Sequence, residues 1–188
     1  MMKKRSAFSV RGITLIGVLA ACVFVLTKFI SIPIPSPLGK TALSLGNAMC
    51  ILSSLLFGPV IGGLASGLGN ALVDLTDPAW AHEFYITFIN KFLMAYMAGI
   101  VMQHFKLGGE KLRVCVAGLC GAVTYTVLYV TKNIIFGLFR GFTWQVAVIE
   151  TLTTKLPVSL VNGVLAVVCA TILFFALRRP LQKAHIIE

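Results

Sequence analysis

Six long apolar runs follow one another along this chain, and only short polar segments separate them. The runs cover residues 13–30, 43–57, 60–75, 84–103, 112–139 and 146–177. A helix that crosses a bilayer needs about 20 mostly apolar residues. The pattern therefore predicts an all-α bundle of six transmembrane helices, folded as one domain over residues 1–188.

The second and third runs are shorter than the others and meet at Phe57, Gly58 and Pro59. Proline can begin a helix but cannot extend one, because it has no backbone N–H to donate. We expect these two runs to form a tight helical hairpin.

The composition is that of an integral membrane protein, with 58% hydrophobic and 12% charged residues. The first run follows a basic segment, as it would in a secretory signal. However, the next segment, SIPIPSPLGK, lacks a small-residue cleavage site, and further apolar runs follow it. We therefore expect the first run to be retained as a helix.

Ten of the sixteen Lys and Arg residues lie near the ends of the runs, before the first, after the fourth and after the sixth. They are Lys3, Lys4, Arg5, Arg11, Lys106, Lys111, Arg113, Arg178, Arg179 and Lys183. Basic residues concentrate on the cytoplasmic side of membrane proteins. Both termini, residues 1–12 and 178–188, are therefore predicted to be cytoplasmic, and the net charge of +10 needs no nucleic-acid partner.

Four ionisable residues, Lys91, Lys132, Glu150 and Lys155, lie within or at the outer ends of the last three runs. A charge inside a span costs about 3 kcal/mol on insertion scales, so such residues usually face the bundle interior and mark a substrate path. Polar and aromatic neighbours share their helix faces or lie in the outer loops. The predicted ligand-binding residues from this pattern are Asp74, Trp80, Tyr85, Asn90, Lys91, Tyr129, Lys132, Asn133, Phe136, Trp144, Glu150, Lys155 and Asn162.

A second interpretation is that these charges satisfy one another. Lys155 would then pair with Glu150, Lys91 with Asp74, and Lys132 with a backbone carbonyl. The two tryptophans would be ordinary interface anchors. The excess of basic over acidic groups, with amides and aromatic rings around them, favours a polar organic ligand that has acceptors and a stackable ring.

Small residues are concentrated in two places, the segment GLASGLGNALVD and the pair Gly17 and Ala21, which are four residues apart. Such spacing lets helices approach closely in lipid. It indicates either internal packing or a docking face for the helices of a partner.

The chain has no motif that indicates catalysis or metal binding. Its five cysteines occur singly in apolar runs, and His82, His104 and His185 are far apart in the sequence. We expect no catalytic residue, no metal site and no cofactor, which argues against a membrane-embedded enzyme. A membrane scaffold or assembly protein without a small ligand remains an alternative.

Four segments together resemble the substrate-binding S components of energy-coupling factor (ECF) transporters, which take up vitamins in bacteria. They are LIGVLAACVFVL, the block from IPIPSPLGK to NALVDL, YITFINKFLMAYMAG, and KLPVSLVNGVLAVVCATILFFAL. The resemblance implies six helices in the bacterial plasma membrane, a vitamin pocket near the outer surface and a lid formed by residues 31–40. It also adds Asn47 to the predicted ligand-binding residues, because SLGN stands where many relatives have NLGD.

The same resemblance implies partners, namely a transmembrane coupling subunit and two ATP-binding subunits. The chain itself has no GxxxxGK[ST] phosphate-binding loop, which fits a non-catalytic capture subunit. Docking on the coupling subunit would involve Gly17, Ala20 and Ala21. The chain departs from the family's AxxxA pattern, because its nearest match is Gly17 with Ala21, and Phe24 lies four residues after Ala20. The ligand expected first is pyridoxine or a hydroxymethylpyrimidine, followed by riboflavin or the much larger cobalamin.

Overall fold

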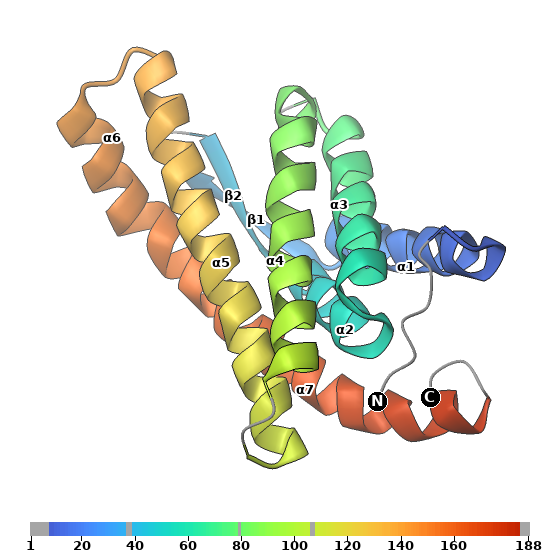
Figure 1. The fold of residues 1–188 in the computed structure, drawn as a ribbon. Coiled ribbons are helices and arrows are strands. Elements are labelled where there is room, and N and C mark those ends of the chain that lie inside the picture. The colour runs from blue at the N-terminus through green and yellow to red at the C-terminus, as the bar shows by residue number, and fades with distance from the viewer. Residues whose placement is uncertain (1–7, 37–38, 79, 106–107, 185–188) are drawn as a thin grey trace.

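The computed structural model describes residues 8–36, 39–78, 80–105 and 108–184, and helices make up most of it (Figure 1). Its helices are α1 (Val10–Phe29), α2 (Gly46–Phe57), α3 (Pro59–Leu75), α4 (Phe84–His104), α5 (Glu110–Phe139), α6 (Trp144–Glu150) and α7 (Leu156–Lys183). Shorter elements are strands β1 (Ser31–Ser36) and β2 (Gly39–Ser44), a 3-10 turn at Ala81–Glu83 and a π-turn at Thr151–Lys155.

Among the residues that the structure describes, four helical segments are long and apolar enough to cross a membrane: Val10–Phe29, Ala81–His104, Glu110–Phe139 and Trp144–Lys183. The apolar helices α2 and α3 have 12 and 17 residues, or about 18 and 26 Å at 1.5 Å per residue. The hydrocarbon core of a bilayer is about 30 Å thick. The structure is therefore that of a helical membrane protein, while full crossings by α2 and α3 stay a prediction.

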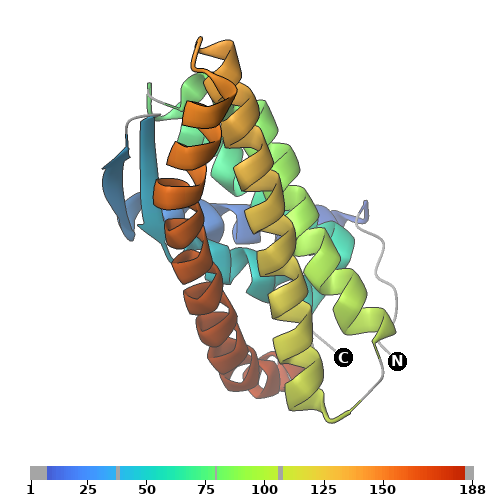
Figure 2. The same ribbon diagram turned by 90° about the vertical axis from the view of Figure 1, so that its left-hand side faces the viewer.

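The helices are arranged around α2. In both views α5 runs beside the long rod that α6, the π-turn and α7 form together (Figure 1, Figure 2). Helices α3 and α4 pack against each other. Helices α2 and α3 form the expected hairpin, which turns at Gly58. Helix α1 runs across the direction of α4 and α5 in both views.

An antiparallel β-hairpin joins α1 to α2. Its register pairs Ser31 with Ser44 and Ser36 with Gly39. The expectation that a helix begins at residue 43 is wrong, because β2 extends to Ser44 and α2 begins at Gly46. Prolines at positions 33, 35 and 37 exclude a helix before this point.

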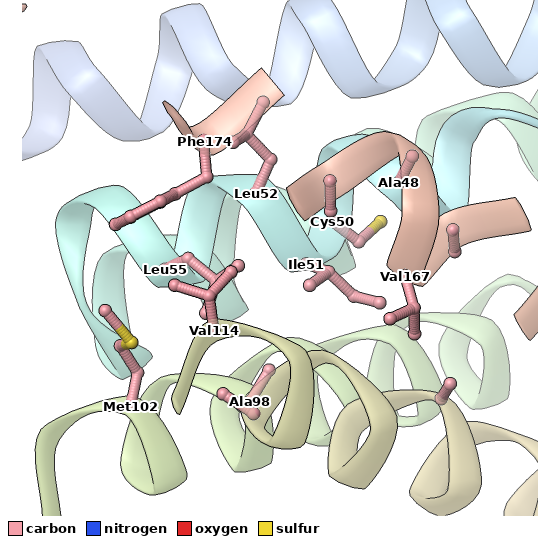
Figure 3. Packing of buried hydrophobic residues seen from close by; sticks show 14 of the residues in the cluster. Ala48, Cys50, Ile51, Leu52, Leu55, Ala98, Met102, Val114, Val167 and Phe174 are labelled. Carbon is pink, nitrogen blue, oxygen red and sulfur yellow. The ribbon is translucent and has the colours of Figure 1, made fainter. Parts of the chain in front are cut away.

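Helix α2 is buried along nearly its whole length, which explains how a short helix can be central. Ile51 and Leu55 have 0% and 1% exposure, and Val114 of α5 and Phe174 of α7 close over them (Figure 3). Fully burying one such aliphatic side chain contributes about 1.5–3 kcal/mol. This apolar core holds α4, α5 and α7 in place below the polar part of the bundle.

The glycines of α3 allow its close contacts with the neighbouring helices. A Cβ added to Gly62 would lie 2.3 Å from Ser54 Cα of α2, and one added to Gly69 would lie 2.6 Å from the Ala20 carbonyl oxygen of α1. The rings of Phe88 and Phe92 cover Gly67 and Gly63 from α4 in the same way. The internal-packing interpretation of these small residues is therefore confirmed.

Replacing Gly62 by alanine should separate α2 from α3, because the backbone of Ser54 cannot move aside as a flexible side chain could. We expect a loss of about 2–3 kcal/mol of stability, typical of an overpacked core. The measurement is the melting temperature of the purified protein in mild detergent. The matched control is Gly17→Ala, since nothing lies within 4 Å of a Cβ added there, and equal melting temperatures for the two variants would contradict the account.

Candidate functional site

A cavity of about 380 Å³ lies between the β-hairpin and the polar ends of the helices. Residues of α1, the hairpin, α2, α3, α4, α5, the π-turn and α7 line it. Ten of the predicted ligand-binding residues are among them: Asn47, Asp74, Trp80, Asn90, Lys91, Tyr129, Lys132, Asn133, Lys155 and Asn162. Residues from runs far apart in the sequence thus meet at one site.

Four predicted residues do not line this cavity. Tyr85 is 51% exposed and meets the edge of the Phe84 ring, and Trp144 is 62% exposed at the start of α6. Phe136 is half-buried on α5, with its ring centroid 6.0 Å from Lys132 Nζ. Glu150 is buried at the end of α6.

Lys91 is one of two lysines of the site that are almost fully buried. The residue is 7% exposed, and its ammonium donates a hydrogen bond to Asn47 Oδ1. The same nitrogen lies 3.9 Å from the centroid of the Tyr125 ring, within the range of a cation–π interaction. Tyr125 in turn stacks on Tyr129, with centroids 5.6 Å apart.

Lys155 reaches the cavity from the π-turn. Its Nζ donates to Asn133 Oδ1 at 2.6 Å, and Asn133 Nδ2 donates to the Tyr129 carbonyl oxygen at 2.8 Å. The second bond fixes which way the amide of Asn133 points. Its oxygen is therefore held toward the lysine.

A buried carboxylate, that of Glu83, binds several basic side chains at one side of the cavity. Glu83 Oε2 accepts a hydrogen bond from Lys132 Nζ at 2.6 Å, while Glu83 Oε1 lies 3.6 Å from Arg140 and 3.4 Å from His82. The expectation that Lys132 bonds to a backbone carbonyl is wrong, because this carboxylate is its partner. The 3-10 turn that carries Glu83 is thereby tied to α5.

Asn162 connects α7 to the hairpin. Its Oδ1 accepts a hydrogen bond from the backbone N–H of Ser44 at 2.9 Å, and its Nδ2 donates to the Ala42 carbonyl oxygen at 2.7 Å. The side-chain amide thus pairs with β2 much as a neighbouring strand would. This contact places Ala42 and Ser44 on the cavity wall.

Thirteen lining residues were not among the predicted ligand-binding residues: Thr27, Lys28, Ser31, Ala42, Ser44, Asn70, Val73, Asp77, Glu83, Thr87, Tyr125, Arg140 and Ser159. Helical spacing contains a signal for several of them. Tyr125 is one turn before Tyr129, and Ser159 is one turn after Lys155. Residues near the hairpin give no such signal, because their place depends on how the two strands pair.

The predicted docking residues lie on different sides of α1. Gly17 and Ala21 are exposed, whereas Ala20 is buried against α3 beside Ile61 and Ala65. Only the first two can contribute to an outward face. Within the part of the chain that the structure describes, no group of three His, Cys, Asp or Glu side chains could hold a metal ion.

Comparison with known proteins gives one family and several partial relatives. The family model for the S component of ECF-type riboflavin transporters matches residues 7–179. An uncharacterized protein of Pyrococcus woesei is 45% identical over 60 residues, which are 31% of this chain and 39% of the relative. A UPF0397 protein of Leuconostoc citreum is 40% identical over 82 residues, 42% of this chain and 43% of its own length.

A UPF0397 protein of Lacticaseibacillus casei matches over a longer stretch, with 26% identity over 137 residues, 71% of this chain and 67% of the relative. The chain thus spans less than half the length of the first two relatives. No solved structure gives a significant match.

Replacing Glu83 by glutamine should leave Lys132 in a largely buried position without its counter-charge, since both side chains are only 10–12% exposed. We expect a loss of about 3 kcal/mol of stability, as is typical when one partner of a buried pair is removed. A second change, Lys132→Met, should restore much of it. Thermal unfolding in detergent measures both effects.

The control is Glu110→Gln, which breaks the pair with Arg178 at the other end of α5. Both of those side chains are about one-third exposed, so the cost should stay below about 1 kcal/mol. If the two glutamate variants lose the same stability, burial does not make the Glu83–Lys132 pair more important for folding than the exposed pair.

Proposed function

Since the chain belongs to the S component family of ECF-type riboflavin transporters, we propose that it is the non-catalytic subunit that captures a water-soluble vitamin. The observation that carries this proposal is the polar cavity between the hairpin and the helices. Its volume of about 380 Å³ falls in the range of small-molecule sites, roughly 300–1,000 Å³. A chain that otherwise exposes apolar surface concentrates its buried lysines and asparagines there, together with two half-buried tyrosines.

The side chains indicate the kind of ligand. Lys91 and Lys155 are donors only, and the amides of Asn90 and Asn133 add further polar contacts. The stacked rings of Tyr125 and Tyr129 lie on one wall and offer an aromatic surface. This chemistry suits a heteroaromatic ring that carries hydroxyl or ring-nitrogen acceptors.

Pyridoxine or a hydroxymethylpyrimidine fits this description, and so does riboflavin, the vitamin in the family's name. Cobalamin is much larger and would require the hairpin to move away from α7. We rank the smaller heteroaromatic vitamins and riboflavin ahead of it for that reason.

Delivery of the vitamin would follow docking on a transmembrane coupling subunit in the bacterial plasma membrane, with two ATP-binding subunits supplying the energy. The exposed small residues Gly17 and Ala21 support a docking face on α1, because small side chains let helices approach closely. The basic residues near the chain ends support cytoplasmic termini.

Replacing Lys155 by alanine should weaken vitamin binding while the protein remains folded and extractable. Loss of a hydrogen bond from a charged donor costs about 1.5–3 kcal/mol, so we expect a 10- to 100-fold rise in Kd. Titration calorimetry of the purified protein with riboflavin, pyridoxine and hydroxymethylpyrimidine measures it. Lys111→Ala, at the exposed start of α5, serves as the control.

Unchanged affinity in Lys155→Ala would contradict the assigned role of this lysine. If the unaltered protein binds none of the vitamins, and none raises its melting temperature, the scaffold alternative is favoured instead.

Replacing Gly17 by leucine should interfere with docking and leave vitamin binding intact, because this position is exposed and is not among the residues that line the cavity. Co-purification with a tagged coupling subunit from the same cells should fall at least 10-fold. Val18→Leu, which adds one methylene at a neighbouring exposed position, is the control. Normal co-purification of the glycine variant would contradict the docking face.

A further inference from the structure

The rod Trp144–Lys183 contains one turn that is not α-helical. At Thr151–Lys155 the chain forms a π-turn, and the N–H of Leu156 donates to the carbonyl oxygen of Thr151, five residues earlier. Pro157 follows directly and cannot donate the α-helical bond to Thr153. A wide turn at this point is therefore favoured by the sequence.

The π-turn keeps the buried faces of α6 and α7 on the same side of the rod. Every fourth residue is buried, namely Ala147, Thr151, Lys155, Ser159 and Gly163. In a straight α-helix, residues four apart rotate by about 40° relative to one another, so such a series would drift around the helix. The wider turn in the middle reverses part of that drift.

Glu150 is the residue whose placement changes most. In an α-helix it would point about 140° away from Lys155, because residues five apart are on different faces. A π-turn joins residues i and i+5, which brings such residues onto one face. In the structure Glu150 is 9% exposed and Lys155 is 3% exposed, whereas Leu152 between them is 45% exposed.

Thr151 is buried next to Glu150 at the start of the π-turn. Its hydroxyl is fully buried but has no hydrogen-bond partner among the residues that the structure describes. Burying a hydroxyl without a partner is unfavourable. The charged groups around Lys155 are Glu150, Lys132, Glu83 and Arg140. Of the two carboxylates among them, that of Glu150 belongs to the same rod as Lys155.

We propose that Glu150 is a positioning residue of the binding site, which the π-turn brings to the face of Lys155 so that the lysine ammonium is held at Asn133 and toward the cavity. Glu150 itself does not line the cavity. It acts on the ligand only through Lys155. The proposal rests on the proposed function, in which Lys155 contacts the vitamin.

The test changes the rotation of α6 relative to α7. Inserting one alanine between Leu152 and Thr153 turns α6 by about 100° and moves Glu150 off the face of Lys155. Deleting Leu152 instead leaves Glu150 and Lys155 four residues apart. Residues at this spacing lie on the same face of an uninterrupted α-helix. Leu152→Ala keeps the length of the chain and is the matched control.

The ligand measurement uses whichever of riboflavin, pyridoxine and hydroxymethylpyrimidine the unaltered protein binds most tightly. We expect the insertion to raise Kd at least 10-fold, as Glu150→Ala should, and the combination of both changes to raise it no further. The deletion and Leu152→Ala should stay within 3-fold of the unaltered protein. Equal affinities of the insertion and deletion chains would overturn the proposal.

A second measurement needs no ligand, so it separates failure of this proposal from failure of the proposed function. Cysteine placed at position 150 is labelled with N-ethylmaleimide, and peptide mapping distinguishes it from the native cysteines. Labelling should be slow in the original register and in the deletion chain, and at least 10-fold faster in the insertion chain. Equal labelling in all three registers would overturn the role of the π-turn even if no vitamin bound.

Discussion

Positive charge placed inside an apolar bundle has to be balanced by groups within that bundle, and the polar half of this molecule is arranged around this requirement. Lys91, Lys132 and Lys155 each donate to a side-chain oxygen, which belongs to Asn47, Glu83 and Asn133 respectively. These contacts join α4 to α2, α5 to the 3-10 turn, and the π-turn to α5. The hydrogen bonds that satisfy the buried ammonium groups therefore also link the elements that line the cavity.

The apolar half of the molecule, around α2 and α3, is held together by close packing. Helix α2 is surrounded on nearly all sides, and the glycines of α3 let its backbone lie against α1, α2 and α4. Such a core is dense and resists rearrangement. The hairpin, by contrast, is joined to α7 through the two hydrogen bonds of Asn162.

Periodicity in the sequence predicts much of this structure. The long helices, the break at Pro59 and the convergence of Lys91, Lys132, Asn133 and Lys155 all follow from apolar runs and helical faces. The hairpin does not, because the pairing of two short proline-rich strands depends on tertiary contacts such as that of Asn162. Glu83 as the partner of Lys132 was missed for a related reason, since a loop residue has no helical spacing to place it. The inward rotation of Glu150 depends on one wide turn, which α-helical spacing cannot predict.

If the lysines and tyrosines that line the cavity enclose a vitamin, the purified protein should carry one, and identifying the molecule that it carries is the first measurement to make. The protein would be purified in mild detergent from cells supplied with vitamins, denatured, and its released small molecules identified by mass spectrometry. The account predicts a heteroaromatic vitamin in nearly equimolar amount, and far less of it from a chain with both Lys91 and Lys155 replaced by methionine. Release of lipid alone from the unaltered chain would contradict the account.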